Sequence, residues 1–248
     1  MDNAALVTLS RQVALRRELD VVANNLANVN TNGFKGEHMT FEEYLMPVAR
    51  ADGFPRGDRR LSYVQDKASW RDFSHGAVEV TSNPLDVAIK GDAFFVVQTP
   101  AGERYTRDGS FQIDSQGRLV TSDGQPVMSN AGPITFAEDE TDISIGKDGT
   151  ISTNLGDRGH LRLVAFDDPH LLRAEGDSRF SSATPGTDVP LGSVGVVQGA
   201  IEKSNVQPVV ETTRLIEITR AYQTLASMMQ SSSELKQSAI QRLADIPV

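Results

Sequence analysis

The two ends of the chain carry helical apolar patterns that neither end can bury on its own. Near the N-terminus, apolar residues recur at steps of three and four from Leu15 to Val29. Near the C-terminus, the same spacing runs from Leu215 to Leu243, and Pro208 stands just before it, where a first helical turn tolerates proline. A single helix with one apolar stripe is marginally stable in water. We therefore expect the two terminal helices to pair as a coiled coil, with surplus apolar surface contacting other copies of the chain.

Between these ends, the pattern changes to that of short strands. From Thr81 to about residue 200, short apolar runs alternate with Asp-Gly pairs at positions 108–109, 123–124 and 148–149. Such pairs are typical of the turns that join antiparallel strands. The segment from Arg50 to Trp70 combines Gly, Pro and mixed charges with weak periodicity, which is typical of an extended linker or a small ordered loop.

These patterns predict an α+β fold in which an antiparallel β-rich domain is inserted between two paired helices. The expected parts are an N-terminal helix in residues 1–35, a linker or extended loop in 36–80, the β-rich domain in 81–200 and a C-terminal helix in 201–248. The helices should be about 25 and about 35 residues long. Only the β-rich middle is expected to fold by itself.

Composition excludes several classes of protein. The chain has no cysteine, which excludes disulfide frameworks, cysteine-ligated metal sites and thiol catalysis. Its net charge is −9 and its basic runs are no longer than two residues, so no nucleic-acid partner is expected. The longest apolar runs are far shorter than the roughly 20 residues that span a bilayer, so no membrane insertion is expected. The N-terminus also lacks the uninterrupted apolar stretch of a cleaved signal peptide.

Candidate catalytic and metal-binding groups are scattered. The histidines at positions 38, 75, 160 and 170 do not form the pair of a helical metal site. The glycine-containing segments lack the strand-turn-helix context of a phosphate loop, and the segment 167–170 does not match the spacing of a calcium loop. We therefore expect no enzyme activity, no metal and no cofactor.

Asparagine is concentrated at the end of the predicted N-terminal helix, with five in positions 24–32. Each costs roughly 0.5–0.7 kcal/mol relative to alanine in a helix interior. One interpretation is an ordinary helix end, at which Asn32 and Gly33 form a structural turn and Gly33 stops the helix with a positive φ. For Asn24 and Asn25 we instead expect amide hydrogen bonds to neighbouring protomers.

Several segments resemble the bacterial flagellar rod and hook protein family. The first, at the asparagine-rich helix end, reads ANNLANVNTNGFK. The matching segments are Ala23–Lys35, Asn83–Val97, Tyr105–Phe111, Gly117–Thr121, Gln198–Val206 and Arg220–Gln223. Together they run along nearly the whole chain. Within the family, the proximal-rod members are the most similar, and the distal-rod and hook members are the alternative.

The resemblance implies a structural subunit of the flagellar basal-body rod. Such a subunit polymerises with copies of itself and with other rod proteins into the axial drive shaft for swimming, within the periplasm. The resemblance also implies export by the flagellar type III apparatus, unfolded and without a cleaved signal peptide. The residues alone leave two alternatives: a periplasmic binding module with a helical stalk, and, less well supported, an enzyme.

The expected assembly interface lies on the two terminal helices. Its residues are Leu15, Leu19, Val22, Asn24, Asn25, Leu26, Asn28, Leu215, Ile218, Tyr222, Leu225, Met229 and Leu243.

Overall fold

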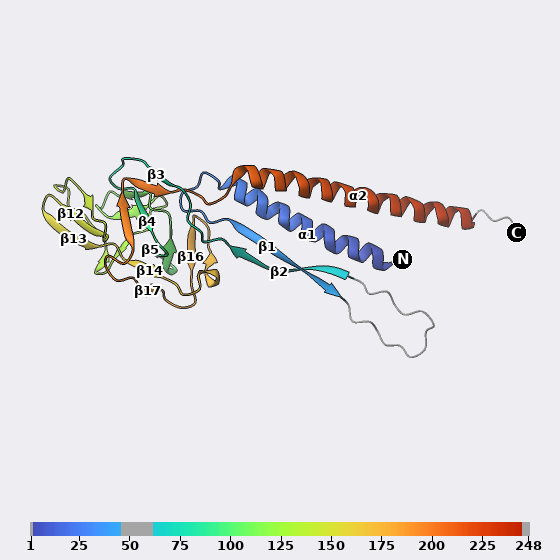
Figure 1. Cartoon of the computed structure of the whole chain (residues 1–248), viewed down its shortest axis with the longest axis horizontal. Coiled ribbons are helices and arrows are strands. Elements are labelled where there is room, and N and C mark those ends of the chain that lie inside the picture. The colour runs from blue at the N-terminus through green and yellow to red at the C-terminus, as the bar shows by residue number, and fades with distance from the viewer. Residues whose placement is uncertain (1, 46–61, 245–248) are drawn as a thin grey trace. The chain divides into compact units, whose positions relative to one another are not determined.

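The computed structural model describes residues 2–45 and 62–244, which divide into two compact units. The helical unit contains the described parts of Met1–Ala27, Glu37–Trp70 and Gln207–Val248. The β unit contains Asn28–Gly36 and Arg71–Val206. The expected α+β class is confirmed, because a helix, an antiparallel β-rich region and a second helix follow one another along the chain (Figure 1).

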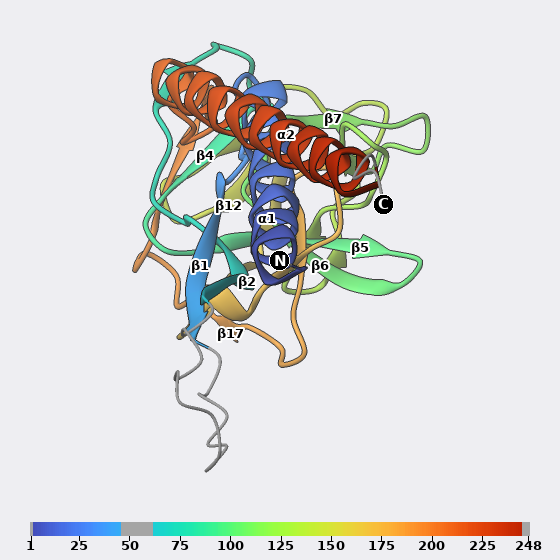
Figure 2. The same ribbon diagram turned by 90° about the vertical axis from the view of Figure 1, so that its right-hand side faces the viewer.

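The helical unit is built on α1 (Asp2–Ala27) and α2 (Pro208–Ala244), which have 26 and 37 residues. The two helices lie side by side and run in opposite directions (Figures 1 and 2). Helix α2 begins at Pro208, in agreement with the sequence pattern. A backbone N–H in the first turn makes no intrahelical hydrogen bond, so a proline there loses none. Neither α1 nor α2, nor any other helix in residues 2–45 and 62–244, is long and apolar enough to cross a membrane.

A two-stranded sheet of β1 (Glu37–Leu45) and β2 (Ser62–Arg71) completes the helical unit. These strands occupy much of the segment expected to be a linker, and the rings of His38 and Trp70 lie 5.0 Å apart across them. The Gly and Pro residues that suggested a linker fall in positions 46–61, which lie outside the described residues. The linker expected in residues 36–80 is therefore wrong where β1 and β2 lie, because the weak periodicity of this segment did not reveal the two strands.

The β unit consists of short strands, one 3₁₀ helix and turns. The elements are β3 (Val78–Val80), β4 (Val87–Lys90), β5 (Phe94–Thr99), β6 (Gly102–Thr106), β7 (Phe111–Ile113), β8 (Leu119–Thr121), β9 (Met128–Ser129), β10 (Gly132–Pro133), β11 (Ser144–Ile145), β12 (Thr150–Thr153), β13 (Gly156–His160), β14 (Leu163–Ala165), η1 (Pro169–Leu171), β15 (Arg173–Ala174), β16 (Arg179–Ser181), β17 (Thr187–Asp188), β18 (Gly195–Gln198) and β19 (Ala200–Glu202).

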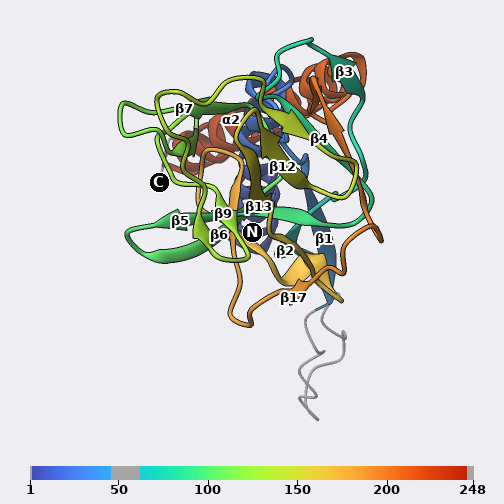
Figure 3. The same ribbon diagram turned by 90° about the vertical axis from the view of Figure 1, so that its left-hand side faces the viewer.

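Its largest sheet has six strands in the order β15-β16-β6-β5-β14-β17. The β5–β6 hairpin lies within this sheet, with Phe95 opposite Thr106 and Thr99 opposite Gly102 (Figure 3). Smaller antiparallel pairs and one three-stranded sheet, β11-β12-β13, surround it. The antiparallel β-rich region that the sequence predicted between Thr81 and about residue 200 is therefore present.

Strand β5 separates two apolar clusters. Phe95 and Val97 belong to one cluster, and Phe94 and Val96 belong to the other. Because successive side chains of a strand point to opposite faces, a strand covered on both faces is apolar throughout. This explains why five consecutive residues from Ala93 to Val97 are buried.

One of the three predicted Asp-Gly turns has a different role. Asp123-Gly124 and Asp148-Gly149 form tight turns, and both glycines have positive φ. The pair at 108–109 instead connects β6 to β7, which do not pair with each other. A Cβ at Gly109 would lie 1.8 Å from the Val87 carbonyl oxygen, so glycine is required there by close backbone packing.

Candidate assembly site

The apolar stripes of α1 and α2 form a seam within the helical unit. Val22 and Ile218 are buried in it. Most of the other apolar and aromatic residues predicted at the interface are half-buried: Leu15, Leu19, Leu26, Leu215, Tyr222, Leu225 and Met229. Leu243 lies in α2, but its side chain is outside the described residues. Most of the apolar stripe predicted on each helix therefore packs against the other helix of the same chain.

An ion pair links the two helices. Arg214 Nη2 lies 3.1 Å from Glu18 Oε1. Antiparallel pairing from this contact brings the start of α1 opposite about residue 230 of α2, at 1.5 Å of rise per residue in both helices. The last part of α2 therefore extends past α1 (Figure 1).

Both helices also expose apolar side chains that the seam does not use. On α1 these are Leu9 and Val13, and on α2 they are Val209, Val210, Ile216, Met228, Leu235 and Ile240. Exposed apolar residues that gather into a patch are typical of a protein-protein contact. None of them is among the interface residues predicted from sequence, which follow the main apolar stripe of each helix.

The structure corrects the expected role of Asn25. We expected its amide to bond a neighbouring protomer, but its Nδ2 donates to the Glu37 carbonyl at 2.8 Å. Its Oδ1 accepts from the Glu37 N–H at 2.9 Å, and the residue is 1% exposed. The side-chain amide thus bonds both the N–H and the carbonyl of Glu37, as the backbone of a neighbouring strand would. These two bonds anchor the first residue of β1 to α1. Its hydrogen-bonding capacity is therefore satisfied within the chain.

The other asparagines of this segment differ from one another. Asn24 is exposed on α1. Asn28 follows the last residue of the helix, and its side-chain oxygen accepts from Thr31 Oγ1 at 3.1 Å. The Asn32 side chain accepts from Lys203 Nζ at 3.3 Å. The expected contact of Asn24 with a neighbouring protomer stays a prediction.

Gly33 has the expected positive φ, at 64°, but it does not stop the helix. Helix α1 ends at Ala27, six residues earlier, and Gly33 belongs to the β unit. Its N–H donates to the Glu202 carbonyl at 2.7 Å. A Cβ there would lie 2.3 Å from the Asp108 nitrogen, so both the φ and the close packing require glycine.

Two residues beyond Gly33, a lysine enters the interior of the β unit. Lys35 Nζ lies 2.6 Å from Glu202 Oε1 and donates to the Ser74 carbonyl at 2.7 Å. Glu202 Oε2 lies 3.3 Å from Arg107 Nη1. The three side chains, which we call the buried triad, are 0%, 1% and 2% exposed for Lys35, Glu202 and Arg107.

The electrostatics of the buried triad reflect its burial. Desolvation lowers the pKa of Lys35 below its ordinary value, and the Glu202 carboxylate opposes this shift. Desolvation also lowers the pKa of Arg107, again against Glu202. One carboxylate is therefore shared by two cations, and removing one member of such a cluster leaves a buried charge with too few partners.

Asn205 forms a second link between the two terminal segments inside the β unit. Its Oδ1 accepts from the Gly36 N–H at 2.8 Å, and its Nδ2 donates to the Asp72 carbonyl at 2.7 Å. Asn205 follows β19, whereas Gly36 follows the turn after α1. The segments before α2 and after α1 are thus bonded to each other through side chains.

No local sequence pattern marks the buried triad or Asn205. Lys35 and Asn205 do lie in segments that resemble the rod and hook family, which was the available signal. Burial of lysine and glutamate could not be inferred, because both are normally exposed unless they are paired.

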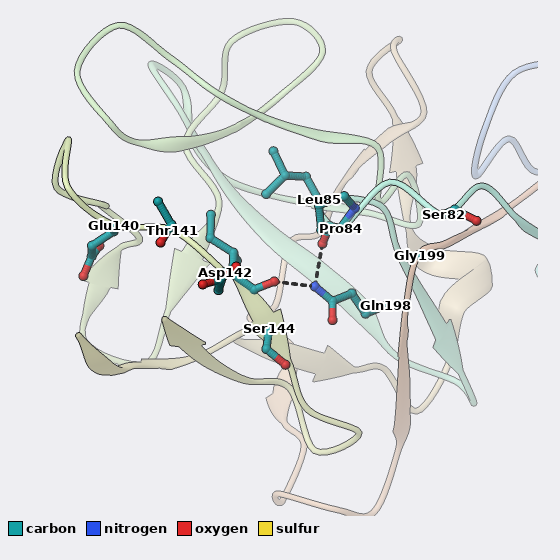
Figure 4. A pocket seen from close by; sticks show the side chains of 10 residues that line it. Ser82, Pro84, Leu85, Glu140, Thr141, Asp142, Ser144, Gln198 and Gly199 are labelled. Carbon is teal, nitrogen blue, oxygen red and sulfur yellow. Dashed lines mark hydrogen bonds between the residues drawn. The ribbon is translucent and has the colours of Figure 1, made fainter. Parts of the chain in front are cut away.

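A separate pocket of about 680 Å³ lies in the β unit (Figure 4). Gln198 reaches into it, and its Nε2 donates to the carbonyls of Pro84 and Ile143, each at 2.8 Å. Glu140 on its rim forms an ion pair with Arg158. The polar groups of this pocket thus hold neighbouring loops together. Among the described residues, no group of three or more His, Asp or Glu side chains could hold a metal ion.

Comparison with protein families gives three matches. Residues 6–35 match the family described as "Flagella basal body rod protein", and residues 88–153 match "Flagellar hook protein FlgE/F/G D1 domain". Residues 197–242 match "Flagellar basal body rod FlgEFG protein C-terminal". The matches at residues 6–35 and 197–242 contain most of α1, Lys35 and Glu202 of the buried triad, and most of α2.

Individual relatives match over nearly the whole length. The flagellar basal-body rod protein FlgF of Caulobacter vibrioides is 43% identical, covering 99% of this chain and all of that protein. FlgF of Rhizobium meliloti is 36% identical, covering 98% of both chains. The rod protein FlgG of Caulobacter vibrioides is 31% identical, covering 94% of this chain and 96% of its own.

Proposed function

The chain belongs to the flagellar basal-body rod protein family, and from this premise we propose that it is a structural subunit of the proximal rod. The observation that carries the proposal is end-to-end similarity to FlgF at 43% identity. The relative named FlgG is 31% identical. This difference favours the proximal rod over the distal rod or the hook, which are the alternative positions within the same axial structure.

The helical unit is the part that we propose polymerises. Its seam uses the predicted stripes of α1 and α2 as an intramolecular coiled coil, and its exposed apolar residues then contact other copies of the chain and other rod proteins. Burial of this second apolar surface is favourable only in an assembly. We further propose that the predicted interface residues act indirectly, because Val22 and Ile218 hold the helix pair together.

Export and location follow from the same proposal. A rod subunit reaches its place in the periplasmic part of the flagellum through the flagellar type III apparatus, without a cleaved signal peptide. A chain with no cysteine has no disulfide to form after transport, which suits a route that requires refolding. The proposal includes no enzyme activity, metal or cofactor, and no partner of the nucleic-acid class.

Isolation of basal bodies tests the proposal. A tagged copy of the chain, expressed in a strain that lacks the native gene, should restore swimming and should remain with the basal body after the membranes are dissolved. A binding module with a helical stalk would instead be recovered in the soluble fraction. Recovery of the tag only in that fraction, with swimming unaffected by the gene's absence, would rule out the rod assignment.

A further inference from the structure

The side of α1 that points away from α2 carries a short apolar surface that ends in a charge. Leu9, Val13 and Arg16 follow one another at steps of four and three, so they share one side of the helix. All three are exposed. At about 100° of rotation per residue, Val13 lies half a turn away from Val22, which is buried in the seam. We call these three residues the outer α1 face.

Helix α2 has a corresponding surface beside the seam. Glu217, Ala221, Thr224 and Met228 follow one another at steps of four, three and four, and all four are exposed. Glu217 is turned by about 100° from its neighbour Ile218, which is buried in the seam. We call these four residues the lateral α2 face. Packing of α1 against α2 within the chain leaves this face uncovered.

The two faces are complementary in charge. Arg16 lies at the end of the outer α1 face, and Glu217 lies at the start of the lateral α2 face. Neither side chain forms an ion pair with another residue in positions 2–45 and 62–244. Opposite charges beside an apolar contact between helices set the choice of partner and the register. These two charges therefore indicate which surface the outer α1 face binds.

An ion pair between these charges would also bring the apolar residues together. In an antiparallel contact, seven residues back from the arginine and seven forward from the glutamate place Leu9 opposite Thr224. Val13 then lies within one residue of Ala221. The short side chains on α2 leave room for the longer ones on α1, as in knobs-into-holes packing. Charge and apolar packing thus agree on one register.

A second copy of the chain is the partner that this register fits. The outer α1 face points away from α2 of its own chain, so it cannot reach the lateral α2 face of that chain. The proposed offset between α1 and α2 differs by one residue from that of Glu18 and Arg214, the ion pair of the seam. Two helical units that run in the same direction therefore make this contact at nearly the same height along their helices.

We propose that the outer α1 face of each copy packs against the lateral α2 face of a second copy, with an ion pair between Arg16 and Glu217. The contact rests on the proposed function and names the surfaces through which copies polymerise. It joins two different surfaces, so each copy keeps one of them for the next neighbour. Because the lateral face is turned by only about 100° from the seam, each added copy is rotated relative to the last, and the array curves around an axis.

Engineered cysteines test the contact, because the chain has none of its own. The full chain with Val13→Cys and Ala221→Cys is expressed in a strain that lacks the native gene, and isolated basal bodies are oxidised and separated on a denaturing gel without reductant. Dimers and larger multimers should form, because each copy contributes a cysteine to two contacts. Either cysteine alone should give none. Val13→Cys combined with Gln223→Cys, an exposed position on another side of α2, is the matched control and should also give none.

Charge exchange provides a second measurement. Arg16→Glu and Glu217→Arg should each reduce swimming, and the double variant should restore it. Both residues are exposed, so the purified variants should melt within about 2–4 °C of the wild type.

Two results would overturn the contact. One is a Val13→Cys, Ala221→Cys chain that forms no more multimers than the Gln223→Cys control. The other is a charge-exchanged double variant that swims as poorly as the single ones, which would indicate a different rod protein as the partner. Failure of the wild-type chain to restore swimming would instead reject the rod function itself.

Discussion

Lys35 and Glu202 are separated by 167 residues in the sequence, and their charged atoms lie 2.6 Å apart inside the β unit. Lys35 follows α1 and Glu202 precedes α2, so this bond joins the two segments that lead into the terminal helices. Asn205 bonds Gly36 in the same region. The β unit therefore contains a firm connection between the chain segments that carry the proposed polymerising helices.

Loss of the lysine should destabilise the β unit strongly. Lys35→Met removes one of two cations from a buried carboxylate, and breaking a buried pair costs about 3–5 kcal/mol. Urea unfolding of the full chain measures this change. Lys90→Met, which alters an exposed lysine on β4, is the control and should change the free energy of unfolding by less than about 0.5 kcal/mol. Equal effects of the two substitutions would contradict the importance of the buried triad.

Gly33→Ala should lower the free energy of unfolding by more than Gly124→Ala does. Both glycines have positive φ, at 64° and 81°, and a left-handed conformation costs an L-residue about 1–2 kcal/mol. A Cβ at Gly33 would also lie 2.5 Å from the Arg107 carbonyl carbon, whereas at Gly124 it would meet no atom within 4 Å. The difference in free energy of unfolding between the two variants therefore measures the close packing alone. Identical losses would show that packing at Gly33 relaxes without cost.

Asn25→Ala should release the start of β1 without disrupting α1. The Glu37 N–H donates to the Asn25 side chain, so its hydrogen exchange should become faster in this variant. Alanine is the better helix former, so helix content should not fall. Asn24→Ala, on an exposed neighbouring position, should leave exchange at Glu37 unchanged. Exchange at Glu37 that is insensitive to Asn25→Ala would refute the anchoring role.

Substitution of a buried and of an exposed isoleucine on α2 should distinguish effects on folding from effects on assembly. Ile218→Asp places a charge in the seam and should cost about 3 kcal/mol or more. Ile216→Asp alters an exposed side chain and should change stability by less than about 0.5 kcal/mol, while still reducing swimming. Thermal unfolding of the purified chains and swimming of the complemented strains measure the two effects. Normal swimming with Ile216→Asp would exclude this face from the rod contact.

The pH dependence of stability should have opposite signs at two carboxylates. Burial raises the pKa of Asp108 above 3.8, so the folded chain binds more protons than the unfolded one between the two pKa values. The contribution of Asp108 therefore falls as pH rises through that window. Asp108→Asn keeps an oxygen for the Ser110 N–H and hydroxyl, which bond Oδ1 at 3.0 and 2.6 Å. Its stability relative to the wild type should increase as pH rises.

Asp114 provides the comparison. A backbone hydrogen bond from Arg118 is the main cause that lowers the pKa of Asp114 below 3.8. The stability that Asp114 contributes to the folded chain is present above pH 3.8 and is lost as the pH falls through the pKa of the folded state. Asp114→Asn should therefore become less stable relative to the wild type as pH rises. Urea unfolding across the acid range measures both differences, and a common sign would contradict these assignments.

Local patterns predicted most of the fold, whereas the contacts between distant segments could not be predicted. The stripe from Leu215 to Met229 and the run from Ala93 to Val97 repeat with the period of their own element, so sequence spacing was sufficient. The Lys35–Glu202 bond depends on how the chain folds back after 167 residues, and no local period encodes it. Glu211 interrupts the apolar stripe as a charged residue, so the hydrophobic pattern does not predict that it is buried.

Imaging of basal bodies from a strain without this gene tests the central claim most directly. If the chain is a structural subunit of the proximal rod, the rod should be absent or truncated in that strain, the cells should not swim, and re-expression of the chain should restore both. Intact rods and normal swimming in the absence of the gene would contradict the account.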